Sequence, residues 1–304
     1  MGSLGLDLLP TTCLLLVVCL VVAVSSVGSD EERLIGWKGE VEQQEEEGVY
    51  RHPETAGRDP WIETISWKPR AFIYHGFLSL EECDHLRGVA LKRLERSMVV
   101  GDDGKDAVDD VRTSFSASIN LFETETIYNI ETRIANWTHL PIAHGEPMEV
   151  LRYKHAQKYD SHWDYFGGDS TNSSTGDRVA TVLMYLSDVM DGAGGETSLP
   201  LAEAIDEQLQ STAGMSECAS KMGIAVRPRK GDALLFWNSL PEALISDKRS
   251  LHASCPTFKG EKWTATKWIH TRAYLDSEVI KAAEGEAMRK RASRLAAEAQ
   301  GSQQ

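Results

Sequence analysis

The stretch KYDSHWDYF, residues 158–166, contains a histidine and an aspartate two positions apart among aromatic residues. Side chains of a β-strand alternate between its faces, so His162 and Asp164 are predicted to project from the same side. An imidazole nitrogen and a carboxylate oxygen on one face are two ligands of a metal site. Either His252, in KRSLHASCP, or His270, in KWIH, can supply a third ligand. Two imidazoles and one carboxylate suit non-haem Fe(II) and leave three coordination positions open.

A lysine further along the chain indicates a second component of this chemistry. Lys262 follows His252 by ten positions (262 − 252) and lies in GEKWTATKW, a run with the composition of a strand. A lysine that points into a core needs an anion as partner, because an unpaired buried charge is very costly. A dicarboxylic cosubstrate would supply that anion. In the alternative interpretation Lys262 and Lys267 both lie on the surface, and we expect at least one of them to face solvent.

The elements that must hold these residues are mostly strands. Strands are predicted in ISWKPRAFIYHGFLS, RTSFSASINL, MEVLRYKHAQKYDSHWD, RVATVLMYLSD, GIAVRPRKGDALLFW, SLHASCPTF and KWTATKWIHTRAY. The apolar run VATVLMYL is predicted to be a central strand. Helices are predicted over SLEECDHLRGVALKRL, where Ser79 and Glu82 form a capping box, and over NIETRIANWTHL. Many strands and few helices indicate a sandwich or barrel with helices on one side.

Six motifs carry a family resemblance: YDSHWDYF, RVATVLMYLSDV, GGETSLP, GIAVRPRKGDALLFWN, SLHASCP and KWTATKWIH, in that order. From about Trp67 to Tyr274 the chain resembles the catalytic domain of prolyl 4-hydroxylases, especially the single-chain plant and algal type. The resemblance implies a mainly β domain with supporting helices, built on a double-stranded β-helix (jelly-roll) core. It also implies three cofactors, namely Fe(II), 2-oxoglutarate and L-ascorbate, the last to restore iron left oxidised.

The resemblance assigns a role to each candidate site residue. It implies His162, Asp164 and His252 as iron ligands, and Lys262 as the partner of the far carboxylate of 2-oxoglutarate. The same carboxylate would accept hydrogen bonds from Tyr153 and Thr197, which would fix its orientation. The peptide side would be formed by Tyr159, Arg178, Trp268 and His270. The histidines at positions 75, 85, 139, 144 and 155 are expected to be ordinary surface or loop residues.

The predicted reaction is hydroxylation of peptidyl proline at C4 with Fe(II), 2-oxoglutarate and O2, which releases succinate and CO2. The expected substrates are proline-rich secretory or cell-wall proteins. Two alternatives are a non-catalytic module that binds proline-rich peptides and a 2-oxoglutarate oxygenase with a lysyl or free amino acid substrate. Three departures bear on sequence preference: GAGGET is longer than the EGGET usual in the family, RTSFSASINL replaces a more glycine-containing segment, and NSLPEALISDKRS is a somewhat long loop before His252.

The chain is expected to enter the secretory pathway. Residues 1–27 contain an apolar run from Leu8 to Val24, which predicts a signal peptide or, if uncleaved, a single-pass type II anchor. The body would then lie in the lumen of the endoplasmic reticulum or Golgi, and sequons at Asn136 and Asn172 agree with this location. Three further regions are predicted: an acidic linker at 28–64, the catalytic domain at 65–275, and a charged helical or disordered tail at 276–304.

Charge and cysteine content limit the partners and the redox state. The formal net charge of -14 argues against a nucleic-acid partner, because phosphate recognition relies on lysine and arginine. Three of the five cysteines lie outside the apolar segment. We hypothesise that Cys218 and Cys255 form a disulfide near the iron site and that Cys83 is unpaired.

Overall fold

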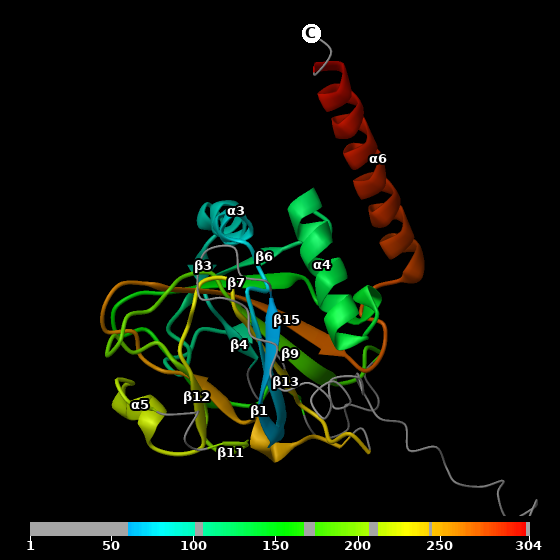
Figure 1. The fold of residues 1–304 in the computed structure, drawn as a ribbon. Helices are drawn as coiled ribbons and strands as arrows, with labels where there is room; N and C mark the ends of the chain where they lie inside the picture. The colour runs from blue at the N-terminus through cyan, green and yellow to red at the C-terminus, as the bar shows by residue number, and fades with distance from the viewer. Residues whose placement is uncertain (1–59, 101–105, 167–173, 207–211, 243–244, 302–304) are drawn as a thin grey trace, which may run out of the picture.

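A computed structural model of the chain describes residues 60–100, 106–166, 174–206, 212–242 and 245–301. The predictions for residues 1–59 and for the sequon at Asn172 lie outside the described residues. In this part of the chain two antiparallel sheets face each other, with helices on the outside of the larger one (Figure 1). The chain is therefore mainly β with supporting helices, as predicted.

The larger sheet has nine strands in the spatial order β11 (Glu203–Ala204), β1 (Trp61–Lys68), β2 (Arg70–His75), β13 (Ala233–Trp237), β9 (Arg178–Tyr185), β15 (Lys262–His270), β7 (Met148–Tyr153), β6 (Phe115–Ile119) and β3 (Glu95–Arg96). The smaller sheet has the order β12 (Ile224–Val226), β10 (Thr197–Leu199), β14 (His252–Ser254) and β8 (Tyr159–His162). A separate ribbon pairs β4 (Val99–Val100) with β5 (Asp106–Ala107). The apolar run predicted to be central is β9, in the middle of the larger sheet.

The helices are α3 (Leu80–Leu91), α4 (Glu125–Thr138), α5 (Glu217–Ser220) and α6 (Ser277–Gly301), with short 3-10 turns η1 (Ile142–His144) and η3 (Lys248–Ser250). The capping box of α3 is confirmed, because Ser79 and Glu82 each accept a hydrogen bond from the other's backbone N–H. The second helix begins earlier than predicted, because the Thr124 side chain caps it through the Ile127 N–H. The tail forms α6, which contacts α4 and extends beyond it at its C-terminal end (Figure 1).

Alternation along the strands divides the interior into two layers. On β13, Ala233, Leu235 and Trp237 join the core beneath α3 and α4, while Leu234 and Phe236 join the core between the two sheets. Strand side chains point to opposite faces in turn, so every strand of the larger sheet can serve both layers. The layer between the sheets is the one that also receives the polar residues of the site.

The first strand differs from the expectation in extent and partner. The sequence predicts one strand from about Ile65, but β1 begins at Trp61 and pairs with β2 in an antiparallel hairpin. The upstream residues are held by His75, because Trp61 stacks on its ring at 4.2 Å and Glu63 contacts its Nε2 at 3.1 Å. Its Nδ1 contacts Asp232 at 2.8 Å. His75, at the end of β2, therefore connects β1 with the residue just before β13. It was expected to be an ordinary surface or loop histidine.

His75 is expected to make stability depend on pH. Burial alone would lower its pKa, but hydrogen bonds to Asp232 and Glu63 outweigh burial and raise the pKa from 6.5 to about 9. A raised folded-state pKa contributes stability that is full below pH 6.5 and is lost as the pH rises through 9. A difference of 2.5 units (9 − 6.5) corresponds to up to about 3 kcal/mol. Urea denaturation at pH 6 and pH 9.5 should show this loss in the native protein.

The variant His75→Gln isolates this effect from other titrating groups. It should be less stable than the native protein at pH 6 and nearly equal to it at pH 9.5. The control is His85→Gln, since the Nε2 of His85 lies 2.9 Å from the neutral Thr124 hydroxyl. If the difference between native protein and His75→Gln is the same at both pH values, the linkage is wrong.

The position of Lys267 also differs from the expectation, which was that at least one of Lys262 and Lys267 faces solvent. Both Lys262 and Lys267 are 1 % exposed, and they lie on opposite faces of β15. Lys267 points toward α4, where its Nζ lies 2.8 Å from the carboxylate of Glu131, which is also buried. Its Nζ also donates to the Glu146 carbonyl. The helix that covers this face supplies the counter-charge, which the strand sequence alone does not reveal.

Removing Lys267 should destabilise the fold strongly. Lys267→Met leaves Glu131 buried and unpaired, which typically costs about 3–5 kcal/mol. The double variant Lys267→Met, Glu131→Gln should recover much of this loss, because it removes both charges. Lys281→Met is the control, since its pair with Glu278 is exposed and such pairs contribute less than about 1 kcal/mol. Equal free energies of unfolding for Lys267→Met and Lys281→Met, measured in urea, would contradict the prediction.

The structure tests the cysteine prediction, whereas the predicted signal peptide or anchor lies outside the described residues. A disulfide joins Cys218, on α5, to Cys255, just after β14, and Cys83 is a buried free thiol, as hypothesised. Burial raises the pKa of Cys83 to about 12. In the part of the chain that the structure describes, no helix has the length and apolar character needed to cross a membrane.

Candidate active site

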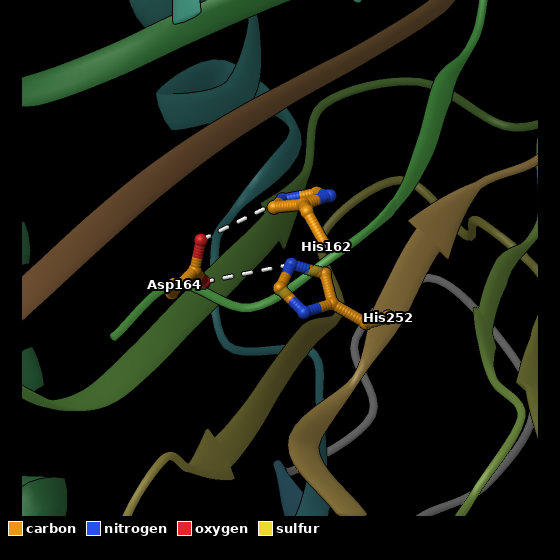
Figure 2. A group of neighbouring side chains, drawn as sticks. All are labelled: His162, Asp164 and His252. Carbon is orange, nitrogen blue, oxygen red and sulfur yellow. Dashed lines mark ion pairs between the residues drawn. The ribbon is translucent and has the colours of Figure 1, made fainter. Parts of the chain in front are cut away.

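His162, Asp164 and His252 converge at one edge of the smaller sheet. Strands β8 and β14 are antiparallel neighbours, and His162 lies directly opposite His252. Asp164 lies beyond the end of β8, so the chain after the strand turns its carboxylate inward, and strand alternation is not the reason for the convergence. Figure 2 shows the three side chains pointing toward one another. One ligand atom from each lies within 4.8 Å of the others.

The hydrogen bonds of the two imidazoles determine which nitrogen faces the centre. The Nδ1 atoms of His162 and His252 lie 2.8 Å and 3.0 Å from the carbonyl oxygens of Asp160 and Ser250. A carbonyl only accepts, so each Nδ1 carries the proton and each Nε2 presents a lone pair. These Nε2 atoms lie 3.6 Å and 3.5 Å from the two carboxylate oxygens of Asp164.

Such a set of lone pairs fits a metal cation. Burial and the nearby His252 lower the pKa of His162 to about 3, so its ring is neutral at physiological pH. Burial alone would raise the pKa of Asp164, but His252, His162 and Arg178 outweigh burial and lower it. Two imidazoles and a carboxylate, without a thiolate, form the ligand set typical of non-haem Fe(II).

A narrow cavity of about 40 Å³ extends from the three residues between the two sheets. Lys262 lies in its wall, and its Nζ donates to the Ser254 hydroxyl at 2.8 Å and lies 5.2 Å from the centre of the Tyr153 ring. Thr197 lines the same cavity and accepts a hydrogen bond from the fully buried Tyr185 hydroxyl at 2.9 Å. The residues predicted to bind the cosubstrate are therefore together, and they come from both sheets.

The chemistry of this cavity fits a carboxylate ligand. Burial lowers the pKa of Lys262 to about 7, and the nearby Glu196 carboxylate opposes the shift. Among the described residues, the Lys262 ammonium has a neutral hydroxyl as its hydrogen-bond partner and forms no ion pair. Two more wall residues, Thr264 and Trp268, have buried polar atoms without a hydrogen-bond partner among the described residues. A bound dicarboxylate would satisfy a lysine and such donors together.

The glycines of GAGGET allow Thr197 to reach this cavity. Gly194 has a φ of +75°, and a Cβ there would lie 2.0 Å from the Pro256 carbonyl oxygen. Only glycine permits this conformation and this close approach. The chain can then run beside β14, where Thr197 lies opposite Ser254 in the ladder.

A groove of about 970 Å³ opens at His162 and Asp164 of the metal site. Tyr159, Arg178 and Trp268 line it, as the resemblance implies, and so do the exposed aromatic residues Trp163 and Phe166. The Tyr159 ring also stacks on His162, with ring centres 3.5 Å apart. The aromatic wall therefore continues directly to the metal site.

His270 does not line this groove or the inner cavity. It is 2 % exposed, and its Nε2 lies 2.7 Å from the carboxylate of Glu146. The same carboxylate accepts two hydrogen bonds from Arg178, at 2.5 Å and 3.0 Å, and the Arg178 guanidinium lies over the Trp268 ring at 4.2 Å. His270 lies behind the groove wall and holds Glu146, so the structure does not support direct contact with substrate.

Several residues of the site were not found from the sequence. They are Arg112, Glu146, Thr181, Asn238 and Ser254. The available signal was a polar residue inside an otherwise apolar strand, as at Thr181 in RVATVLMYL, because buried polar groups need partners. That signal predicts a partner and does not identify it, since the partner comes from another strand.

Comparison with known proteins agrees with this geometry. Residues 148–270 match the family model of the 2OG-Fe(II) oxygenase superfamily. The chain is 46% identical over 220 residues to Probable prolyl 4-hydroxylase 7 of Arabidopsis thaliana, which covers 72% of this chain and 68% of that protein. It is 46% identical over 216 residues to Prolyl 4-hydroxylase 2 of the same plant, with 70% and 71% covered.

A solved structure of viral collagen prolyl hydroxylase from Paramecium Bursaria Chlorella virus-1, in complex with 2OG, is 27% identical. It covers 66% of this chain and 95% of its own, with a TM-score of 0.48. The extent and level of identity to the plant proteins are decisive for the family. This chain belongs to the prolyl 4-hydroxylases of the 2OG-Fe(II) oxygenase superfamily.

Proposed function

We propose that this protein hydroxylates peptidyl proline at C4 in proline-rich secretory or cell-wall polypeptides. The reaction consumes 2-oxoglutarate and O2 and releases succinate and CO2. One observation carries the proposal: three lone-pair ligands face one point, at the junction between a cavity with a buried lysine and an open aromatic groove. The family membership of the chain supports the same reaction.

Each residue near the junction has a proposed task. His162, Asp164 and His252 hold Fe(II), while Lys262, Tyr153 and Thr197 bind the far carboxylate of 2-oxoglutarate. When bound, Fe(II) would activate O2 as the oxidant and 2-oxoglutarate would supply two electrons, so that one oxygen atom enters succinate and the other enters an unactivated C–H bond. The charge of Lys262 and the hydroxyls of Tyr153 and Thr197 orient the cosubstrate. Because these groups are buried, water is kept away from the far carboxylate of the cosubstrate.

The groove is proposed to bind the peptide in an extended conformation. Proline-rich segments adopt the polyproline II helix, which docks in aromatic-lined grooves. Tyr159 and Trp268 support this assignment, because both line the groove and the inner cavity and so lie beside the metal site. Arg178, held by Glu146, keeps the Trp268 ring in place by packing over it.

Mass spectrometry of peptides separates this function from its alternatives. A poly-proline peptide incubated with the protein, Fe(II), 2-oxoglutarate and ascorbate should gain oxygen, with equivalent formation of succinate. Omission of ascorbate should shorten the period of activity. Binding of the peptide without oxygen gain or 2-oxoglutarate consumption would favour the binding module. Oxygen gain only with lysine peptides or a free amino acid would favour the other oxygenase.

We also propose a location in the lumen of the secretory pathway, with the N-terminal segment as signal peptide or membrane anchor. The Cys218–Cys255 disulfide supports an oxidising compartment. Asn136 is exposed on α4, so its side chain is accessible in the folded protein, whereas Trp137 and Thr138 of the same sequon are buried. Expression in plant cells should yield protein in the microsomal fraction that is protected from added protease, and a cytosolic, protease-sensitive product would contradict this location.

A further inference from the structure

Two buried polar residues of the larger sheet reach the carboxylate of Asp164. Thr181 lies on β9 and Asn238 directly follows β13, the neighbouring strand, and they are 1 % and 0 % exposed. The Thr181 hydroxyl lies 2.7 Å from Oδ2 of Asp164, and Asn238 Nδ2 lies 3.0 Å from the Thr181 oxygen. A polar side chain in the core of a central strand needs a hydrogen-bond partner, because a buried polar group without one is costly.

The direction of these hydrogen bonds follows from the chemistry of the groups. An ionised carboxylate only accepts, so the single hydroxyl hydrogen of Thr181 is donated to Asp164. The Thr181 oxygen must then accept from the amide N–H of Asn238. Reversing the amide would set its oxygen against the Thr181 oxygen, with no hydrogen between them. Asn238 therefore donates to Thr181, and Thr181 donates to Oδ2 of Asp164. We call this directional chain of two hydrogen bonds the relay.

This relay distinguishes two oxygens that the histidines do not distinguish. Oδ1 lies 3.6 Å from the Nε2 of His162, and Oδ2 lies 3.5 Å from the Nε2 of His252. Either oxygen, or both together, is therefore within reach of a cation held by the two rings. The hydroxyl of Thr181 occupies Oδ2 and leaves Oδ1 as the better free donor.

We propose that Thr181, oriented by Asn238, is a positioning residue that limits Asp164 to a single metal-binding oxygen, Oδ1. This inference rests on the proposed function of the site as an Fe(II) centre. A carboxylate that bound through both oxygens would take a coordination position that the two-histidine, one-carboxylate arrangement otherwise leaves open for cosubstrate and O2. Partners that orient a metal ligand typically change metal affinity or activity by about 10- to 100-fold when they are removed.

The test compares Thr181→Val, which loses the hydroxyl and keeps the shape, with Thr181→Ser, which keeps the hydroxyl. The probe is Co2+ in place of Fe2+, measured by competition with a chelator and by its visible absorption bands, so turnover is not needed. Thr181→Val should bind Co2+ about 10- to 100-fold more weakly and change the band pattern, while Thr181→Ser should stay within about threefold of the native protein.

Asn238→Ala provides a second variant, since the Thr181 hydroxyl loses the donor that orients it. Its Co2+ affinity should fall in the same direction, by roughly 3- to 10-fold. Thr138→Val is the matched control, because it removes a buried threonine hydroxyl of α4 that donates to the Ile134 carbonyl. It should lose stability and keep native Co2+ affinity and spectrum.

Native Co2+ affinity and an unchanged spectrum in folded Thr181→Val would overturn the inference. If Thr181→Val does not fold, native affinity in Asn238→Ala would overturn it equally. Failure of the native protein itself to bind metal or to consume 2-oxoglutarate would instead refute the proposed function. The two failures are therefore distinguishable in one set of measurements.

Discussion

Asp164→Asn is expected to reduce proline hydroxylation by more than about 100-fold, beyond the range typical for an outer partner of a metal ligand. The substitution keeps the shape of the side chain and removes the negative charge. Because Thr181 donates to the Oδ2 position, the amide oxygen of the new side chain should take that position. The amide N–H2 group would then take the Oδ1 position, where it would face the lone pair of His162 and repel a cation.

Metal content and turnover should therefore fall together in this variant. Iron bound per chain after dialysis, and succinate formed per minute, are the two measurements. Asp84→Asn is the control, since Asp84 is an exposed residue of α3 that pairs with Lys230. Native iron content with full activity in Asp164→Asn would show that Asp164 is not a metal ligand.

Lys262→Met should raise the KM for 2-oxoglutarate by roughly 100- to 4,000-fold. Loss of one partner from a buried ion pair costs about 3–5 kcal/mol, and each 1.4 kcal/mol is a factor of ten. The KM for the peptide should change little, because Lys262 lines the inner cavity and does not line the groove. Lys262→Arg should recover part of the affinity, since the charge is kept while the shape differs.

A second lysine variant serves as the control for the KM measurements. Lys281→Met removes an exposed lysine of α6 and should leave both KM values native. An oxo acid that lacks the far carboxylate should bind native protein and Lys262→Met equally. If both variants of Lys262 retained the native KM for 2-oxoglutarate, the cosubstrate would have to be oriented differently in the cavity.

The pH dependence of cosubstrate binding follows from the same lysine. Burial lowers its pKa to about 7 in the absence of a bound anion, so at pH 8 a large fraction is neutral. A bound carboxylate favours the charged form, so binding at pH 8 should take up a proton, whereas binding at pH 6 should not. Calorimetry in buffers of different ionisation enthalpy measures this uptake, and none at pH 8 would contradict the assignment.

The main features of the chemistry were predictable from sequence. The H-x-D pair, the later histidine and the lysine ten positions beyond it all lie in recognisable motifs, and the structure brings these four side chains to one region. Strand patterns were also predictable, because alternation in KWTATKWIH separates residues 262, 264, 266 and 268 from their neighbours. Periodicity is a local property, so it survives without knowledge of the partners.

The tertiary structure alone decided what covers each face. Alternation puts Lys262 and Lys267 on opposite faces of one strand, but it does not reveal that both faces are covered. Lys262 lines the cosubstrate cavity, and Lys267 pairs with Glu131 because α4 crosses its face. His270 lines neither the inner cavity nor the groove. His75 pairs with two carboxylates and is not an ordinary surface residue. Long-range packing chooses the partner of a buried charge, and no local pattern encodes it.

The sequence by itself thus determined the residue types of the site, their order and the strands that carry them. The tertiary structure decided that Asp164 meets the histidines from beyond the end of β8, and that Thr181 and Asn238 engage one of its oxygens. The physical reason is that ligand identity depends on the chemistry of single residues. Ligand orientation depends on hydrogen bonds between strands that are far apart in the chain.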